Sequence, residues 1–207
     1  MIHRIVLTGG PAGGKSSALP LIAEHYRKLG YDVYTVPEIP TFFHSNGVLL
    51  KLSPPEYHLA LEIEAFGVHH QLETSFYNLA KSLNRRSLIL TDRGLVDLKA
   101  YCADDKMWEQ VISTRGDRLQ GGLNLDFYKS HYNLVLHFTS TGVDAPQHFT
   151  NENNPARQCT PELAKLLDSK TLKAWDGHPN RIILDNSTDF SGKVSRAIDA
   201  IQTYLHK

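Results

Sequence analysis

Eight residues near the N-terminus have the types and spacing of a phosphate-binding loop. They read Gly9-Gly10-Pro11-Ala12-Gly13-Gly14-Lys15-Ser16 and fit the pattern Gly-x-x-x-x-Gly-Lys-[Ser/Thr]. The glycines of such a loop let successive backbone N–H groups point into one concavity, the lysine reaches the β- and γ-phosphates, and the hydroxyl helps to bind Mg²⁺. The stretch predicts a site for Mg²⁺ and a nucleoside triphosphate, ATP or GTP. The expected nucleotide contacts are Gly10, Pro11, Ala12, Gly13, Gly14, Lys15, Ser16 and Ser17.

A carboxylate and a cation follow a second apolar stretch. Asp92 and Arg93 come directly after residues 87–91, Ser-Leu-Ile-Leu-Thr. A buried strand that ends in Asp is typical of the site that brings a carboxylate to Mg²⁺, so Ser16 and Asp92 are the predicted metal-binding residues. Arg93 would bind a phosphate or the acceptor. Asp97 and Tyr101 follow at four-residue spacing and are expected on one helical face near the acceptor; a capping acid and a core tyrosine are the alternative.

Two further candidates depend on their position in the chain. Glu38 comes just after the predicted strand 32–36, and ligands of open α/β sheets collect outside the carboxyl ends of the strands. A solvated loop glutamate is the alternative. Arg157 ends a segment rich in Gly, Pro and Asn, so we expect it to close over the transferring phosphate as a lid arginine; a surface arginine that opens a helix is the alternative. The catalytic candidates are Lys15, Glu38, Asp92, Arg93 and Arg157.

These residues need a parallel sheet to bring them together. Five strand-like stretches, 5–8, 32–36, 87–92, 133–140 and 181–185, alternate with helical ones, which predicts an α/β fold with helices on both faces. The helix after the phosphate loop is expected to end near Gly30, and Pro20 removes a backbone donor at a place where the helix can kink. A long helix is expected from its N-cap Ser53 to about Leu83. We expect a single domain over 1–207, with a lid-like segment at about 142–160.

Composition restricts the class of protein. The chain has 207 residues, 41% apolar and 21% charged, and its 22 basic residues balance 22 acidic ones, so nucleic acid is not the expected partner. No apolar run approaches the length of a transmembrane segment or a signal sequence, and a cytoplasmic protein is expected. Cys102 and Cys159 have neither disulfide nor zinc spacing. The sequence does not define an oligomeric state.

Five stretches together resemble the P-loop NTPase domain of the TRP-like channel translocation defect protein family. More distantly, the chain is similar to ribosylnicotinamide, thymidylate and deoxynucleoside kinases. The stretches are Leu7-Thr8-Gly9-Gly10-Pro11, Val36-Pro37-Glu38, Thr91-Asp92-Arg93-Gly94-Leu95-Val96-Asp97, Trp175-Asp176-Gly177-His178-Pro179 and Leu184-Asp185-Asn186-Ser187-Thr188-Asp189-Phe190. The resemblance implies a P-loop NTPase fold with five parallel strands in the order 2-3-1-4-5.

The same resemblance implies roles for several residues. Glu38 and Asp92 would face Mg²⁺ and the acceptor, Arg93 would hold an anion, and Arg157 would come from the lid. The loop from Asn186 to Thr188 would border the purine. The chain departs from the family at Val143-Asp144-Ala145-Pro146, where relatives carry a Gly-Ala-Glu-like stretch, and at Gln158-Cys159, where they carry an acid.

Two functions fit these features. The first is a kinase that transfers the γ-phosphoryl group of ATP or GTP to a small nucleoside-like acceptor, held by Glu38, Arg93, Asp97 and Tyr101. The second is a regulatory NTPase that signals its nucleotide state to a partner. The Asn-Lys-x-Asp motif of translational-type GTPases does not occur in the sequence, and Asp92-Arg93-Gly94 stands where Asp-x-x-Gly would be needed.

Overall fold

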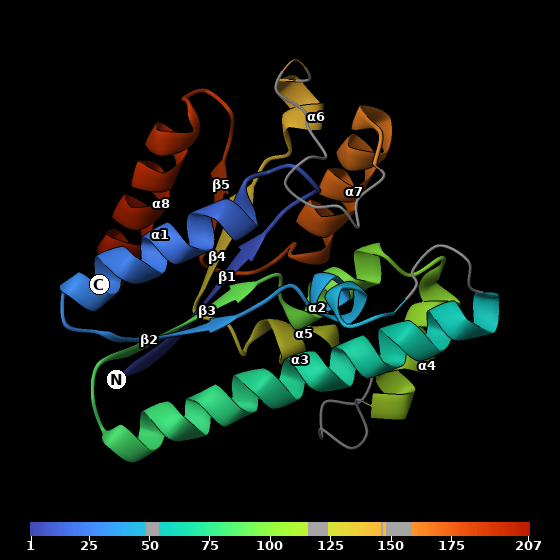
Figure 1. Cartoon of the computed structure of the whole chain (residues 1–207), viewed down its shortest axis with the longest axis horizontal. Coiled ribbons are helices and arrows are strands. Elements are labelled where there is room, and N and C mark those ends of the chain that lie inside the picture. Colours follow the sequence, from blue (N-terminus) through green and yellow to red (C-terminus); the bar gives the residue numbers. More distant parts are fainter. Residues whose placement is uncertain (49–53, 116–123, 146, 148–158) are drawn as a thin grey trace.

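One parallel sheet forms the centre of the molecule (Figure 1). The computed structural model describes residues 1–48, 54–115, 124–145, 147 and 159–207. Within them the sheet has the order β2-β3-β1-β4-β5, with parallel neighbours throughout. This confirms the predicted order 2-3-1-4-5. The strands are β1 (Ile2–Thr8), β2 (Asp32–Val36), β3 (Ser87–Asp92), β4 (Leu134–Phe138) and β5 (Arg181–Leu184).

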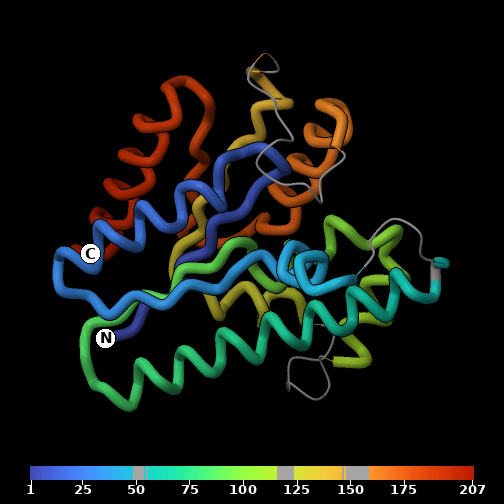
Figure 2. The backbone as a smooth tube through the Cα atoms, viewed as in Figure 1, coloured from blue at the N-terminus to red at the C-terminus, as the bar shows by residue number. Residues whose placement is uncertain are grey.

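Helices cover both faces of the sheet, as predicted. On one face α1 (Lys15–Lys28) and α8 (Phe190–Leu205) pack against Ile5 and Leu7 of β1. On the other face, Val6 belongs to a second core that includes residues of the long helix α3 (Pro55–Leu83), α4 (Asp105–Arg115) and α5 (Leu125–Lys129). The alternation of β1 side chains between the two cores is the period-two pattern of a buried strand. The tube in Figure 2 shows α3 running along this second face.

Further helical elements follow or flank the strands near their carboxyl ends. They are α2 (Ile39–Ser45), the 3₁₀-helix η1 (Leu95–Ala100), α6 (Thr141–Asp144) and α7 (Pro161–Ala174). The strand register pairs Leu7 with Asp92 and Val36 with Thr91. The segments that follow β1, β2 and β3 therefore begin side by side at one edge of the sheet.

Three local expectations are changed or left open by the structure. The helix α1 begins directly at Lys15 and is continuous through Pro20, whose ring lies on the exposed side. Asp97 belongs to a 3₁₀-helix with three residues per turn, so its side chain and that of Tyr101 do not share the α-helical face that four-residue spacing predicted. Ser53, the expected N-cap, lies outside the described residues, and α3 begins at Pro55.

Among the residues that the structure describes, no helix combines the length and the apolar character needed to cross a membrane.

Candidate functional site

The phosphate-binding loop connects β1 to α1. Gly9 and Gly14 have φ of +124° and +87°, a backbone region that favours glycine. A Cβ at Gly9 would lie 2.2 Å from the carbonyl oxygen of Phe138, so the loop lies directly against the end of β4. The Lys15 ammonium is buried and donates to the carbonyls of Gly9 at 3.0 Å and Gly10 at 2.7 Å. The loop thus has the conformation and the cation that a triphosphate site needs.

The back of the loop is held by residues from distant parts of the chain. Asp168 of α7 accepts a hydrogen bond from the N–H of Gly10 at 2.8 Å and one from the N–H of Ser140 at 2.9 Å. The Ser140 hydroxyl donates to the carbonyl of Pro11 at 2.5 Å. Burial alone would raise the pKa of Asp168, but its hydrogen-bond partners, above all His137, lower that pKa below the usual value. Gly10 and Pro11, predicted as nucleotide contacts, are buried on this anchored side.

Asp92 and Ser16 meet in front of the loop, as a magnesium site requires. The Ser16 hydroxyl donates to Asp92 Oδ2 at 2.5 Å. Asp92 is only 2% exposed, and its Oδ1 has no hydrogen-bond partner in the described part of the chain. Burial and the neighbouring charge of Glu38 raise the pKa of Asp92.

These two side chains fit Mg²⁺ held together with a nucleotide. Such sites combine one or two protein oxygens with phosphate oxygens and water. An unpartnered, buried carboxylate oxygen beside a phosphate loop supplies this kind of ligand. In the described part of the chain, no group of three or more His, Cys, Asp or Glu side chains is arranged to hold a metal ion. A metal ion at Ser16 and Asp92 would therefore need phosphate oxygens and water as its other ligands.

A buried ion pair stands beside the metal-binding residues. The Arg93 Nε lies 2.6 Å from Glu38 Oε1, and the Thr41 hydroxyl donates to Glu38 Oε2 at 2.6 Å. Arg93 also donates from Nη1 to the carbonyl of Gly9 at 2.9 Å, which links the pair to the phosphate loop. Burial opposes ionisation of Glu38, but the charges of Arg93 and Lys15 outweigh it and lower the Glu38 pKa to about 2.

Tyr101 and Asp97, the remaining acceptor-site candidates, lie around Arg93 in different ways. The Arg93 guanidinium carbon is 4.8 Å from the centre of the Tyr101 ring, a cation–π contact. Asp97 does not face an acceptor: it is 0% exposed and accepts hydrogen bonds from Thr8, Gly94 and Trp175. The prediction for Asp97 is therefore wrong, because the tight 3₁₀ turn directs its carboxylate into the core.

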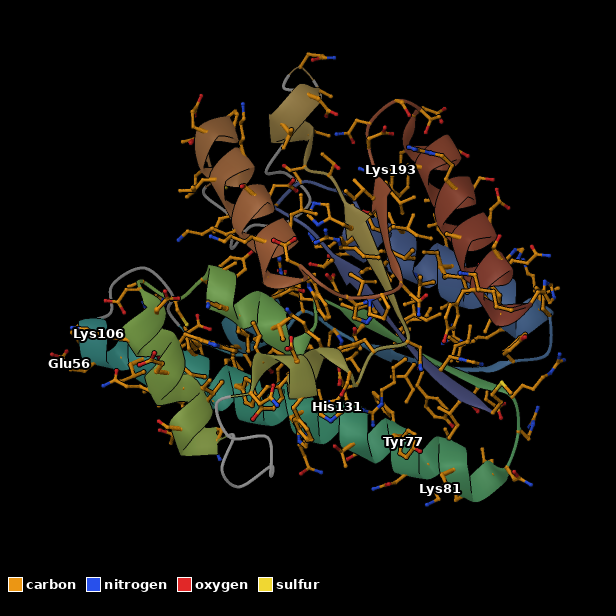
Figure 3. The ribbon with its side chains drawn as sticks, turned by 180° about the vertical axis from the view of Figure 1, so that it is seen from behind. Glu56, Tyr77, Lys81, Lys106, His131 and Lys193 are labelled. Carbon is orange, nitrogen blue, oxygen red and sulfur yellow. The ribbon has the colours of Figure 1, made fainter. Side chains whose placement is uncertain are left out.

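The expected purine-side residues lie across the phosphate loop from Glu38. Asn186 and Thr188 line the same cavity as the loop. Sequence reasoning missed Lys193 of α8, which is 3% exposed and donates to the carbonyl of Thr139 and to Asn186 Oδ1, both at 2.7 Å. Burial lowers the pKa of Lys193 to about 8. Figure 3 labels Lys193 beside the carboxyl ends of the neighbouring strands.

One cavity of about 1390 Å³ joins these two sides. Its floor is the phosphate loop from Ala12 to Ser17, with Asp92 beside it. One wall comes from Glu38 and α2, and the other from α6 and the segment between β5 and α8. Arg157 and most of the expected lid lie outside the described residues, so the lid arginine stays a prediction.

The fold and this cavity define a P-loop, nucleotide-binding domain of the NTPase type. A family model described as an AAA domain matches residues 4–193, and the chain belongs to this family. A comparison with curated proteins finds no match. The resemblance to the TRP-like channel translocation defect family and to ribosylnicotinamide and deoxynucleoside kinases stays a prediction.

Proposed function

We propose that this protein is a Mg²⁺-dependent kinase that transfers the γ-phosphoryl group of ATP or GTP to a hydroxyl of a small, nucleoside-like acceptor. The observation that carries the proposal is the continuous cavity on both sides of the phosphate loop. A nucleotide alone needs the loop and the wall at Asn186 and Thr188. The opposite wall, with Glu38, Thr41 and Phe42, leaves room for a second substrate next to the γ-phosphate.

The donor would be bound by the loop amides and by Lys15. Phosphoryl transfer depends mainly on positioning and on neutralising charge at the phosphate oxygens. The Lys15 ammonium already lies under the loop and can reach a phosphate by exchanging its contacts with the carbonyls of Gly9 and Gly10. Ser16 and Asp92 would hold Mg²⁺, which supplies further positive charge at the phosphates.

Glu38 would orient the acceptor hydroxyl. With a pKa of about 2 it is a carboxylate at neutral pH and can accept a hydrogen bond from that hydroxyl. Arg93 fixes the carboxylate and places a permanent positive charge near the transferring group. We propose that Tyr101 holds Arg93 in place, and that Arg157 adds charge when the lid closes.

One observation favours the second candidate, a regulatory NTPase. Both oxygens of Glu38 already accept hydrogen bonds, from Arg93 and from Thr41. A carboxylate engaged in this way could serve to lock the loop beside Arg93 instead of receiving an acceptor hydroxyl. In that case nucleotide binding would change the contacts of Glu38 without group transfer.

An acceptor screen with two variants separates the candidates. Purified protein is incubated with Mg-ATP or Mg-GTP and a panel of nucleosides, and both nucleotide loss and acceptor phosphorylation are measured. For a kinase, Glu38→Gln lowers acceptor-dependent turnover about 100-fold or more while the nucleotide Kd stays within about threefold of wild type. Lys15→Ala abolishes nucleotide binding under either function. Glu24→Gln, on the exposed side of α1, is the matched control.

Absence of acceptor-stimulated turnover by wild type would contradict the kinase proposal. If nucleotide still bound tightly and Lys15→Ala removed that binding, the regulatory function would be supported.

A further inference from the structure

The buried side chain of Asp97 contacts two segments of the site, the start of the phosphate loop and the turn after Arg93. Its Oδ1 accepts from the Thr8 hydroxyl at 2.5 Å and from the Trp175 indole N–H at 2.8 Å, and its Oδ2 accepts from the N–H of Gly94 at 2.8 Å. Thr8 is the residue just before the phosphate loop, and Gly94 is the residue just after Arg93. A single buried carboxylate therefore contacts the chain at both the donor side and the acceptor side.

Only a carboxylate can accept all three of these hydrogen bonds. Each partner presents a donor at the distances given above, and an ionised Asp is an acceptor at both oxygens. In Asp97→Asn the carbonyl oxygen can keep the bonds from Thr8 and Trp175, but the amide then presents N–H to the N–H of Gly94. The substitution selectively breaks the contact to the turn after Arg93.

The backbone turn at Arg93 and Gly94 is strained and depends on hydrogen bonds from surrounding residues. Arg93 has φ of +71°, a left-handed conformation that costs a residue with a side chain about 1 kcal/mol or more. Its own N–H donates to the carbonyl of Leu7 at 2.9 Å, and the next two N–H groups, of Gly94 and Leu95, donate to Asp97 Oδ2 and to the Tyr132 hydroxyl, both at 2.8 Å. Buried side chains thus fix the backbone that carries the guanidinium of Arg93.

Trp175, which directly follows the last residue of α7, packs against the same turn. It is 0% exposed, and a Cβ at Gly94 would lie 2.7 Å from Trp175 Cζ2, so the indole packs directly on the turn. The indole N–H and the Thr8 hydroxyl donate to the same oxygen, Asp97 Oδ1. A movement of Thr8 at the root of the phosphate loop would change the hydrogen bonding of the indole.

We propose that Asp97 is a positioning residue that sets the Arg93 turn and couples it, through Thr8, to the phosphate loop. Asp97 touches no substrate in this role. It acts on the acceptor side through the Gly94 contact and on the donor side through the Thr8 contact, and Trp175 reports the state of the second contact. The kinetic consequence rests on the proposed kinase function, whereas the spectroscopic consequence requires nucleotide binding alone.

The kinetic test uses Asp97→Asn and a double variant. Asp97→Asn lowers kcat about 10- to 100-fold and leaves the nucleotide Kd within about threefold, because the phosphate-loop contacts are retained. Adding Asp97→Asn to Arg93→Gln lowers kcat by less than about threefold further, because the residue through which it acts is already lost. Independent, multiplicative losses in the double variant would overturn the proposal, since a general loss of structure would add to the effect of Arg93→Gln.

The spectroscopic test uses the fact that the chain has two tryptophans, Trp108 and Trp175. In a Trp108→Phe background, saturating Mg-ATP or Mg-GTP changes the emission of Trp175. Thr8→Val in the same background removes most of this change, whereas Asp97→Asn keeps it because the bonds from Thr8 and Trp175 survive. Nucleotide binding in each variant is confirmed by calorimetry. No response in the Trp108→Phe protein, or an unaltered response with Thr8→Val, would overturn the coupling.

A second variant covers the case in which Asp97→Asn fails to fold. Tyr132→Phe keeps the ring beside Trp175 and removes the acceptor for the Leu95 N–H. It lowers kcat about three- to tenfold, and this loss also disappears in the Arg93→Gln background. Unfolding midpoints are measured for every variant. If wild type shows no transfer but Trp175 responds as described, the kinase proposal fails and the link from Thr8 to Trp175 through Asp97 Oδ1 stands.

Discussion

Arg93 is paired with Glu38, which lines one wall of the cavity, whereas Lys193 itself lines the other wall, and the surroundings of these two buried cations differ. Arg93 lies beside the carboxylate of Glu38, and its interactions with Tyr101, Glu38 and the neighbouring aspartates raise its pKa above the usual value despite burial. Lys193 donates to the neutral oxygens of Thr139 and Asn186, and burial lowers its pKa. One wall therefore has a compensated charge pair, and the other has an ammonium whose desolvation is only partly offset.

The largest expected effect is on stability when each cation is replaced. Arg93→Met leaves the largely buried Glu38 carboxylate without its partner and is expected to lower the free energy of unfolding by about 3 to 5 kcal/mol. Lys193→Met loses two hydrogen bonds but also removes an incompletely compensated buried charge, so a change within about 1 kcal/mol is expected. Urea unfolding at pH 7 measures both. Similar losses of unfolding free energy in the two variants would contradict the expected difference between the paired Arg93 and the incompletely compensated Lys193.

The second effect concerns alkaline pH. The Lys193 pKa is about 8 in the folded protein, against 10.5 for an unperturbed lysine, so between these pH values the unfolded chain binds a proton that the folded chain has released. Stability contributed by this group therefore rises with pH in that interval, by up to about 3 kcal/mol. The measurement is the difference in unfolding free energy between wild type and Lys193→Met at pH 7 and pH 10. A difference independent of pH would contradict the lowered pKa.

The smallest effect is on nucleotide affinity. Lys193→Met frees Asn186 Oδ1 and loosens the segment expected to border the base, so the nucleotide Kd should rise about tenfold, equivalent to one net hydrogen bond. kcat should stay within about threefold, in contrast to Glu38→Gln. Ser187→Ala, an exposed neighbour that does not line the cavity, is the matched control for calorimetric titration. A larger change in kcat than in Kd would contradict the expectation that the wall with Lys193 affects nucleotide binding and the wall with Glu38 affects phosphoryl transfer.

The sequence predicted the fold through local patterns and the resemblance. Apolar runs of strand length defined the five strands, and the resemblance supplied their order. Glu38 and Asp92 were predicted to face one site because both lie at the carboxyl end of a strand, and parallel strands bring these ends to one edge of the sheet.

The remaining parts of the site depend on tertiary packing. Asp168 and Lys193 lie in helices where a single charged residue looks like a solvated one, and only the packing of α7 and α8 shows that both are buried at the phosphate loop and the cavity. The direction of Asp97 depends on the choice between an α-helix and a 3₁₀-helix. Gly94, the N-cap of this helix, packs closely against Trp175, and periodicity does not report such contacts.

The anchoring of the phosphate loop also has a consequence for the order of folding. Gly10 and Pro11 are held by Asp168 and Ser140, which follow them by 158 and 129 residues along the chain. Contacts of such long range form late, because the intervening chain must be ordered first. On the ribosome, the loop would emerge well before α7 and acquire its anchored shape only after α7 has been made and has docked. Nucleotide capture by a nascent chain would therefore mark nearly complete folding of the domain.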